Sequence, residues 1–111
     1  MPVRRPALTP GFAVHPGELM REILTETLKM PIAEAARRMQ ISRPSLYAVL
    51  NGDGGVTADM ALRFGKLTGG NPELYVQMQA QYDLFQARQK LSKTLDKIEP
   101  AAAATKRRRA A

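Results

Sequence analysis

The sequence contains no cysteine and only one histidine in 111 residues. Without cysteine there is no disulfide framework and no thiolate metal site, and one histidine leaves little for any other metal site. No nucleophile, base or metal-ligand set with its usual partners is recognisable, so an enzyme is not expected. The sequence therefore predicts a protein with no catalytic residues, no metal and no cofactor, whose fold is stabilised by side-chain packing.

Long apolar runs are also missing. No stretch approaches the roughly 18 consecutive apolar residues of a membrane-spanning helix. The segment that follows Arg4 and Arg5 is interrupted by proline and glycine, unlike the apolar part of a signal peptide. We therefore expect a soluble domain in the cytoplasm, with no membrane partner.

Positive charge is in excess, with a net charge of +7, but most of it lies near the two ends of the chain. Residues 1–14 carry Arg4 and Arg5, and residues 100–111 carry the KRRR cluster at 106–109. A basic protein is typical of nucleic-acid binding. A basic tail, however, is as often a solvated end as a phosphate-binding arm, and both interpretations of KRRR stay open.

Helical periodicity and capping residues predict an all-α domain of five helices at 15–98, between an extended arm at 1–14 and a disordered basic tail at 99–111. The first helix is expected from His15 to about Lys29, with Pro16 in its first turn. Ser42, Thr57 and Asn71 are suitable N-caps for later helices. Those later helices are expected at 32–39, 43–50, 58–68 and 72–97. His15 is interpreted as a helix-start residue rather than a metal ligand.

Residues 32–51 have the spacing of a helix-turn-helix, in which two short helices flank a tight turn and the second helix reads DNA. Ala36 stands where the helices must approach closely, and Leu46 and Val49 anchor the second helix. Base contacts in the major groove are expected from Arg43, Pro44, Ser45, Tyr47 and Ala48. Phosphate contacts are expected from Lys29, Arg37, Arg38, Ser42 and Asn51. Three other arginines, Arg21, Arg63 and Arg88, are expected on solvated helix faces.

The helix at 72–97 has two apolar faces. One carries Leu74, Tyr75, Met78, Tyr82 and Phe85, and the other carries Val76, Ala80, Leu84, Ala87, Leu91 and Leu95. One face can cover the core, while a domain of this size has no second core for the other. A symmetric homodimer that matches a palindromic operator would bury the remaining face, and we expect the first group at its interface. Alternatively, a twisted helix wraps the core and buries both faces.

Three acidic residues, Glu18, Glu22 and Glu26, lie four positions apart on the first helix, where like charges are mildly destabilising. Two explanations stay open. The three carboxylates form a surface for a basic protein partner, or Arg21 and Lys29 on the same face neutralise them.

The runs HPGELMRE at 15–22 and ISRPSLYAVLNGDGGVTADMALRFGKLTGGNPELYVQMQAQYDL at 41–84 carry a family resemblance. The motifs HPGE, S-R-x-x-[LI], LNG, [IV]TAD-x-ALR and P-E-L-x-x-x-x-Q-x-x-Y-D-L occur in the order found in HigA-type antitoxins of the XRE helix-turn-helix family, which the chain resembles over roughly 15–86. The resemblance implies an antitoxin that neutralises a small basic RNase toxin of the HigB kind and represses its own operon as a dimer.

The sequence departs from the family at two positions. Pro31 replaces a serine or threonine that could cap the second helix, and Gln40 replaces the usual turn glycine. If Gln40 is left-handed, the substitution costs about 1 kcal/mol. These departures are the reason for one alternative, a protein-binding module with weak DNA affinity. An orphan XRE-type transcriptional repressor is a second alternative.

Overall fold

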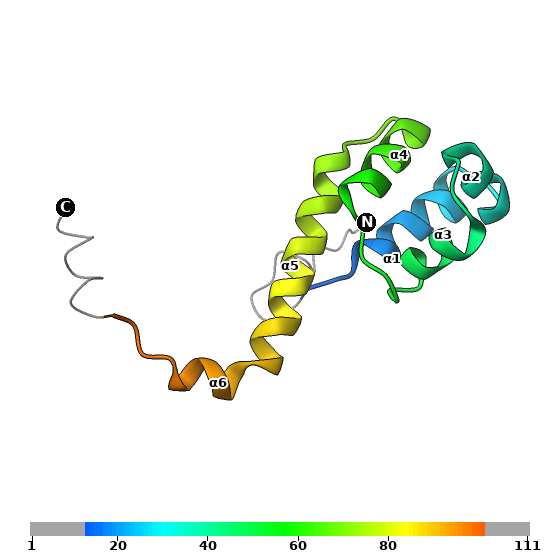
Figure 1. The fold of residues 1–111 in the computed structure, drawn as a ribbon. Coiled ribbons are helices and arrows are strands. Elements are labelled where there is room, and N and C mark those ends of the chain that lie inside the picture. The colour runs from blue at the N-terminus through cyan, green and yellow to red at the C-terminus, as the bar shows by residue number, and fades with distance from the viewer. Residues whose placement is uncertain (1–12, 102–111) are drawn as a thin grey trace, which may run out of the picture.

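The computed structural model describes residues 13–101, and its regular structure there is entirely helical (Figure 1). The elements in order are α1 (Pro16–Glu22), the π-helical segment η2 (Ile23–Thr27), α2 (Ile32–Met39), α3 (Arg43–Leu50), α4 (Ala58–Thr68), α5 (Pro72–Lys90) and α6 (Ser92–Lys97). This confirms the all-α helix-turn-helix class. The predicted N-terminal arm up to residue 12 and the KRRR cluster lie outside the described residues.

Side-chain caps set the starts of three helices at the predicted positions. The Ser42 hydroxyl accepts a hydrogen bond from the Ser45 amide at 3.2 Å, and the Thr57 hydroxyl accepts one from the Met60 amide at 3.1 Å. The Asn71 side-chain oxygen accepts from the Glu73 amide at 3.0 Å. Each cap satisfies an amide that the first helical turn leaves without an intrahelical partner. The starts of α3, α4 and α5 therefore follow from local sequence alone.

The end of the first helix differs from the prediction. The α-helical form stops at Glu22 and widens into η2, whose wider turn closes when the Leu28 amide donates to the Ile23 carbonyl at 2.9 Å. Lys29 then takes a left-handed backbone with φ 52°, which no continuing helix can include. The prediction of one helix to about Lys29 therefore missed the π-helical segment and ran two residues too far.

The last predicted helix is also wrong in part, because it is two helices rather than one. α5 ends at Lys90, Leu91 has φ −100° and ψ 8°, and α6 continues in a new direction (Figure 1). The side chains from residue 88 to residue 100 are all exposed. This stretch therefore has no core packing to hold it in one continuous helix, and most helical stability in proteins comes from such packing.

The core lies between α1, η2, α2, α3 and α4 on one side and the first half of α5 on the other (Figure 1). Tyr75 of α5 is 3% exposed, and its ring meets the Phe64 ring edge-on with centroids 5.2 Å apart. Burial raises the pKa of the Tyr75 hydroxyl above its ordinary value of 10.0. The other buried apolar side chains are Met20, Leu24, Ala35, Ala36, Met39, Leu46, Val49, Leu50, Val56, Met60 and Ala61.

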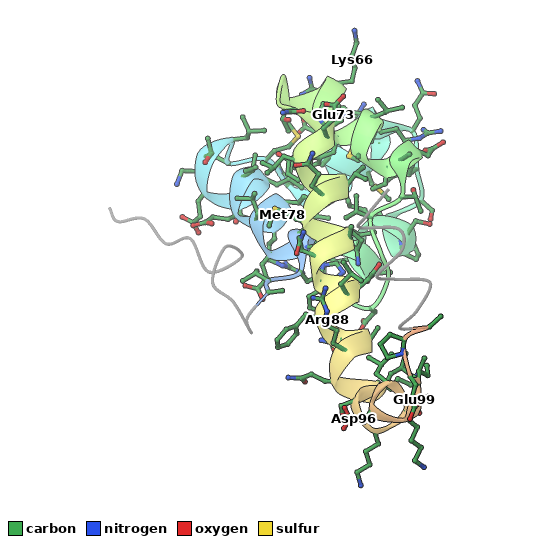
Figure 2. The ribbon with its side chains drawn as sticks, turned by 90° about the vertical axis from the view of Figure 1, so that its left-hand side faces the viewer. Lys66, Glu73, Met78, Arg88, Asp96 and Glu99 are labelled. Atoms are coloured by element: carbon green, nitrogen blue, oxygen red, sulfur yellow. The ribbon has the colours of Figure 1, made fainter. Side chains whose placement is uncertain are left out.

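The two apolar faces of α5 therefore have different surroundings. In the face expected at a dimer interface, Tyr75 is buried, Met78, Tyr82 and Phe85 are half-buried, and Leu74 is 42% exposed. Tyr75 was thus wrongly assigned to a dimer contact, because it packs in the core of its own chain. On the opposite face, Val76, Leu84, Leu91 and Leu95 are 39–46% exposed. Figure 2 shows α5 from Glu73 past Met78 to Arg88, with Asp96 and Glu99 beyond its end.

Candidate nucleic-acid interface

The second helix of the helix-turn-helix, α3, separates its side chains as the spacing predicted. Leu46, Val49 and Leu50 are at most 4% exposed and hold the helix against the core. Four of the five residues expected to contact bases, Arg43, Pro44, Ser45 and Tyr47, are exposed, and the fifth, Ala48, is half-buried. The structure therefore brings all five predicted base-contact residues to the outer side of one helix.

The N-terminus of α3 carries two linked hydroxyl groups. The Ser42 hydroxyl donates to the Ser45 hydroxyl at 2.8 Å while it accepts from the Ser45 amide. Because Ser42 uses its proton on Ser45, the Ser45 proton is directed to a partner outside this pair. Both hydroxyls lie at the positive end of the helix dipole, where an anionic oxygen is favoured.

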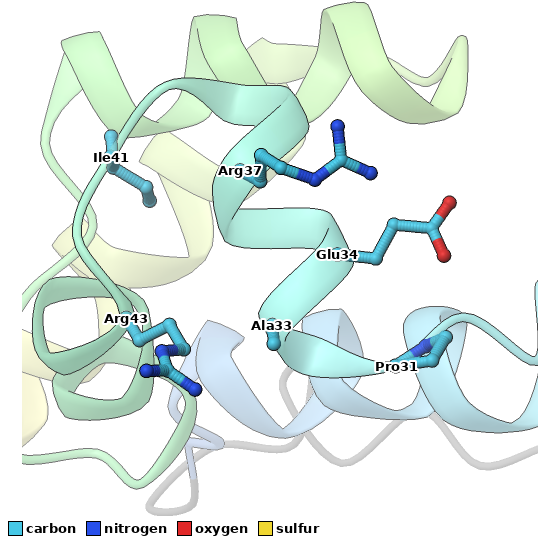
Figure 3. A pocket seen from close by; sticks show the side chains of 6 residues that line it. All are labelled: Pro31, Ala33, Glu34, Arg37, Ile41 and Arg43. Carbon is cyan, nitrogen blue, oxygen red and sulfur yellow. The ribbon is translucent and has the colours of Figure 1, made fainter.

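Arg37 and Arg43 line the same hollow, which runs along α2 and reaches the turn and the first residue of α3 (Figure 3). The hollow has a volume of about 630 Å³, and its other lining residues are Pro31, Ala33, Glu34 and Ile41. Glu34 forms an ion pair with Arg38 at 3.4 Å, but both groups are well exposed and such pairs contribute little. Two arginines from two helices are thus available together on one open surface.

The end of α3 is fixed by an arginine that was expected to be solvated. The Arg21 guanidinium of α1 donates to the Asn51 side-chain oxygen in an exposed contact, which is compatible with the solvated helix face expected for Arg21. Asn51, predicted as a phosphate contact, retains its amide nitrogen as a donor for that role. Lys29, the remaining predicted phosphate contact, is exposed just after η2, where its backbone is left-handed.

The turn of the helix-turn-helix confirms both departures from the family pattern. Gln40 is left-handed, with φ 60° and ψ 47°, and Pro31 offers no side-chain cap to α2. The Ile41 amide bonds to the Ala36 carbonyl at 3.0 Å and the Gln40 amide to the Arg37 carbonyl at 3.1 Å. This pair of bonds closes α2 in the Schellman arrangement, which normally uses glycine at the left-handed position.

Arg63 of α4 supports this turn, a role that was not predicted, although its side chain is still 38% exposed. Its Nη1 donates to the Met39 carbonyl at 2.8 Å and to the Gln40 carbonyl at 3.0 Å, and its Nε bonds to Asp59. Carbonyls at a helix C-terminus have no intrahelical partner, so a cation there is favourable. Charge counting could not have found this role, although Asp59 and Arg63 both belong to the motif VTADMALR.

The acidic residues Glu18, Glu22 and Glu26 are exposed on α1 and η2. Within residues 13–101 the ion pairs join Glu34 to Arg38 and Asp59 to Arg63, so none of the three takes part in one. Because Arg21 is bonded to Asn51, the neutralisation expected from Arg21 is not observed.

Two buried polar residues complete the surroundings of α3. His15 is 6% exposed, and its Nδ1 accepts from the Gly17 amide at 2.9 Å, which confirms His15 as a helix-start residue. Gln79 of α5 is 9% exposed and was not singled out by its sequence context. Its place in the motif P-E-L-x-x-x-x-Q-x-x-Y-D-L was the only available signal.

Two kinds of site can be assessed over the described part of the chain. No helix in it is both long and apolar enough to cross a bilayer. No group of three potential metal-ligating side chains gathers there. The candidate site is the exposed face of α3, because the predicted base-contact residues lie there and Arg37 and Arg43 line one hollow beside it.

Comparison with known proteins gives relatives of both sequence and fold, although no family model matches the chain. Virulence-associated protein A′ of Dichelobacter nodosus is 38% identical over 73 residues, which are 65% of this chain and 63% of that protein. The chain thus spans somewhat less than two thirds of this relative's length.

Two solved structures are similar over nearly their whole length. An addiction module antidote protein of the HigA family from Coxiella burnetii is 34% identical, with a TM-score of 0.72 over 87% of this chain and 99% of that one. The Pseudomonas aeruginosa antitoxin HigA, solved with the higBA promoter, is 28% identical, with a TM-score of 0.74 over 87% and 99%.

The fold and the comparisons together show that this chain is a helix-turn-helix antidote protein. Within this class, the chain belongs to the HigA family of addiction module antitoxins. This confirms the resemblance found in the sequence, together with the expectation of a non-enzymatic transcription regulator.

Proposed function

We propose that this protein binds operator DNA of its own operon as a homodimer and neutralises a small basic RNase toxin of the HigB kind. The main support is the surface of α3, where Arg43, Ser45 and Tyr47 are exposed and Arg43 shares a hollow with Arg37 of α2. An arginine can bond both acceptors of a guanine, and the second arginine can meet a phosphate. The HigA relative solved with its promoter supports the same role. Both activities require a cytoplasmic protein.

DNA binding is tested by gel shift with the DNA upstream of the gene. Arg43→Ala should lose about 1–3 kcal/mol of specific binding, or roughly 5- to 150-fold, because a bidentate base contact disappears. Arg37→Ala should weaken specific and non-specific binding alike and lower the salt slope by about 1. Lys66→Ala, which removes an exposed cation on α4, is the control and should change neither.

The outcome also separates the alternatives. No shift by the wild-type protein at low salt would leave only the protein-binding module. A specific shift without a toxin partner would favour an orphan repressor.

The exposed stripe of α5 and α6 is the proposed dimer surface, formed by Val76, Leu84, Leu91 and Leu95. Four large apolar side chains in a row are unusual on a monomer surface and typical of a protein contact. A second copy of the same helix can cover the stripe through a two-fold axis. We propose this face instead of the one expected from the sequence, because Tyr75 on that face is buried in the core.

Toxin binding is proposed at Glu18, Glu22 and Glu26, because these carboxylates are exposed and have no ion-pair partner within residues 13–101. An acidic surface attracts a basic partner and discourages DNA phosphates. The toxin surface is therefore proposed apart from the DNA-reading face of α3.

This assignment is tested by co-expression with the neighbouring gene, which should yield a co-purifying small basic protein. Reversing all three glutamates to lysine should weaken toxin binding about tenfold or more, since rim charges mainly control association and specificity. Reversing Glu73, Asp96 and Glu99 makes the same change of charge elsewhere and should leave the affinity within about twofold. Equal affinities of the two triple variants would remove the acidic surface from the proposal.

A further inference from the structure

The loop between α3 and α4, residues 51–57, connects the reading helix to the rest of the domain and contains three glycines. Val56 is its only buried apolar side chain, at 5% exposure. Apolar packing therefore fixes only one end of this loop. Arg21 bonds to the Asn51 side chain at the exposed start of the loop. The loop backbone is anchored further on by two buried polar side chains, His15 from the start of α1 and Gln79 from α5.

Both side chains bond to the loop backbone. His15 Nε2 donates to the Gly54 carbonyl at 3.0 Å, and the Gln79 side-chain oxygen accepts from the Val56 amide at 2.7 Å. His15 and Gln79 are the buried polar residues of the described chain. A hydrogen bond made in such a dry environment is directional, and leaving one partner unpaired is costly.

Each of these side chains is itself held from the opposite side. His15 Nδ1 accepts from the Gly17 amide, which places the ring proton on Nε2 for Gly54. The His15 ring meets the Tyr82 ring edge-on, with centroids 5.0 Å apart. The Gln79 nitrogen donates to Asp83 at 2.9 Å, which fixes the orientation of its amide. Neither side chain can turn without losing a second contact.

On the other side, the loop is bonded to the end of the reading helix. The Asp53 and Gly54 amides both bond to the Ala48 carbonyl, at 2.8 and 3.0 Å. A continuous chain of hydrogen bonds therefore runs from α5 and the start of α1, through the loop, to the last turn of α3. α3 reads DNA and α5 carries the proposed dimer stripe, so this chain joins the two surfaces that a dimeric repressor must hold at a fixed distance.

We propose that His15 and Gln79 are positioning residues that set the orientation of the reading helix relative to the dimer helix, and thereby the half-site spacing that the dimer accepts. The inference rests on the proposed function, because it requires a DNA-bound dimer. One base pair moves a half-site by about 3.4 Å along the duplex and about 35° around it. If the His15 and Gln79 contacts hold the loop rigidly, the dimer binds an operator with altered half-site spacing more weakly. If these contacts are lost, the dimer tolerates the altered spacing.

The test uses the full chain and the operator duplex located by footprinting with the wild-type protein. Affinities are measured for this duplex, for versions with one base pair added or removed between half-sites, and for a single half-site. We expect the wild type to prefer the native spacing by about tenfold, since deforming DNA to restore the fit costs free energy. Gln79→Met and His15→Phe should reduce this preference below about threefold while half-site affinity stays within about twofold.

A rescue variant separates positioning from general stability. Gln79→Glu alone places a carboxylate against Asp83, but Gln79→Glu with Asp83→Asn restores an acceptor for Val56 and a donor from position 83, with net charge unchanged. This double variant should recover the spacing preference. If Gln79→Met does not fold, as judged by circular dichroism, Asp83→Ala provides a milder release of the Gln79 amide from an exposed position.

The outcomes are distinct. The inference is overturned if folded Gln79→Met and His15→Phe keep the full preference for the native spacing. Where Gln79→Met does not fold, the same result in Asp83→Ala overturns it. The proposed function is unaffected in both cases. If the variants lose affinity equally for every duplex, including the single half-site, the role of His15 and Gln79 is purely structural and the inference is also overturned. If the wild type binds no operator at all, the proposed function itself fails.

Discussion

Gln40 shows how a single residue can carry a local cost that its neighbours offset. A side chain with a Cβ is disfavoured in the left-handed conformation by about 1 kcal/mol relative to glycine. Gln40 nevertheless has φ 60°, and Arg63 donates to its carbonyl and to that of Met39. The bonds from α4 hold the turn in a conformation that the sequence of the turn does not favour by itself.

Gln40→Gly should therefore raise the free energy of unfolding by up to about 1 kcal/mol, reduced somewhat by the greater freedom of glycine in the unfolded chain. The measurement is urea denaturation followed by circular dichroism. Gln81→Gly, at an exposed position inside α5, is the control and should lower stability by about 1 kcal/mol. Changes of the same sign in both variants would argue against strain at Gln40.

At the scale of elements, α1 and α3 approach so closely that one position cannot carry a side chain. A Cβ on Gly17 would lie 2.0 Å from the Val49 carbonyl oxygen, which is backbone and cannot turn away. Gly17 therefore permits the contact that brings α1 against the end of the reading helix. The sequence motif HPGE contained this residue, but only the packing of the two helices explains it.

Gly17→Ala should lower the free energy of unfolding by about 3 kcal/mol, because the two helices must separate. Gly54→Ala is the matched control, since a Cβ there would meet Ala48 at an ordinary 3.5 Å. Its effect should stay within about 0.5 kcal/mol. A thermal melt of both variants checks the difference, and equal melting temperatures would contradict the close approach.

The break between α5 and α6 was not predicted, because the local sequence of the last helix gives no sign of it. Residues 72–97 contain no glycine and only the proline of the first turn, so nothing in the local sequence marks a break at Leu91. Local propensity is a weak determinant compared with packing. The first half of α5 lies on the core, while the side chains of residues 88–100 are all exposed. The helix therefore breaks where its support from the rest of the chain ends.

At the scale of the whole molecule, the apolar stripe on α5 and α6 requires a covering partner, and a second copy is the one we propose. Leu84→Asp should convert the dimer to a monomer in analytical ultracentrifugation, because it introduces a charge into an apolar contact. Operator affinity should fall about 100-fold or more, as the two half-sites are no longer bound together. The stripe residue Leu84 is 46% exposed in the isolated chain, so folding should be unaffected.

Leu62→Asp provides the control for this experiment. Leu62 lies on α4, is 61% exposed and is not part of the stripe. The Leu62→Asp variant should leave both the sedimentation coefficient and the operator affinity unchanged. Dimerisation retained in Leu84→Asp and lost in Leu62→Asp would move the interface to α4.

The sequence by itself determined the features that local chemistry controls. N-caps at Ser42, Thr57 and Asn71 set helix starts, and the inward spacing of Leu46 and Val49 set the outer face of α3. Only the tertiary structure decided which face of α5 is covered, and what Arg21, Arg63, His15 and Gln79 bond to. The physical reason is distance along the chain. Caps act within three residues, whereas these bonds join residues 23 to 39 positions apart, whose meeting depends on how the helices pack.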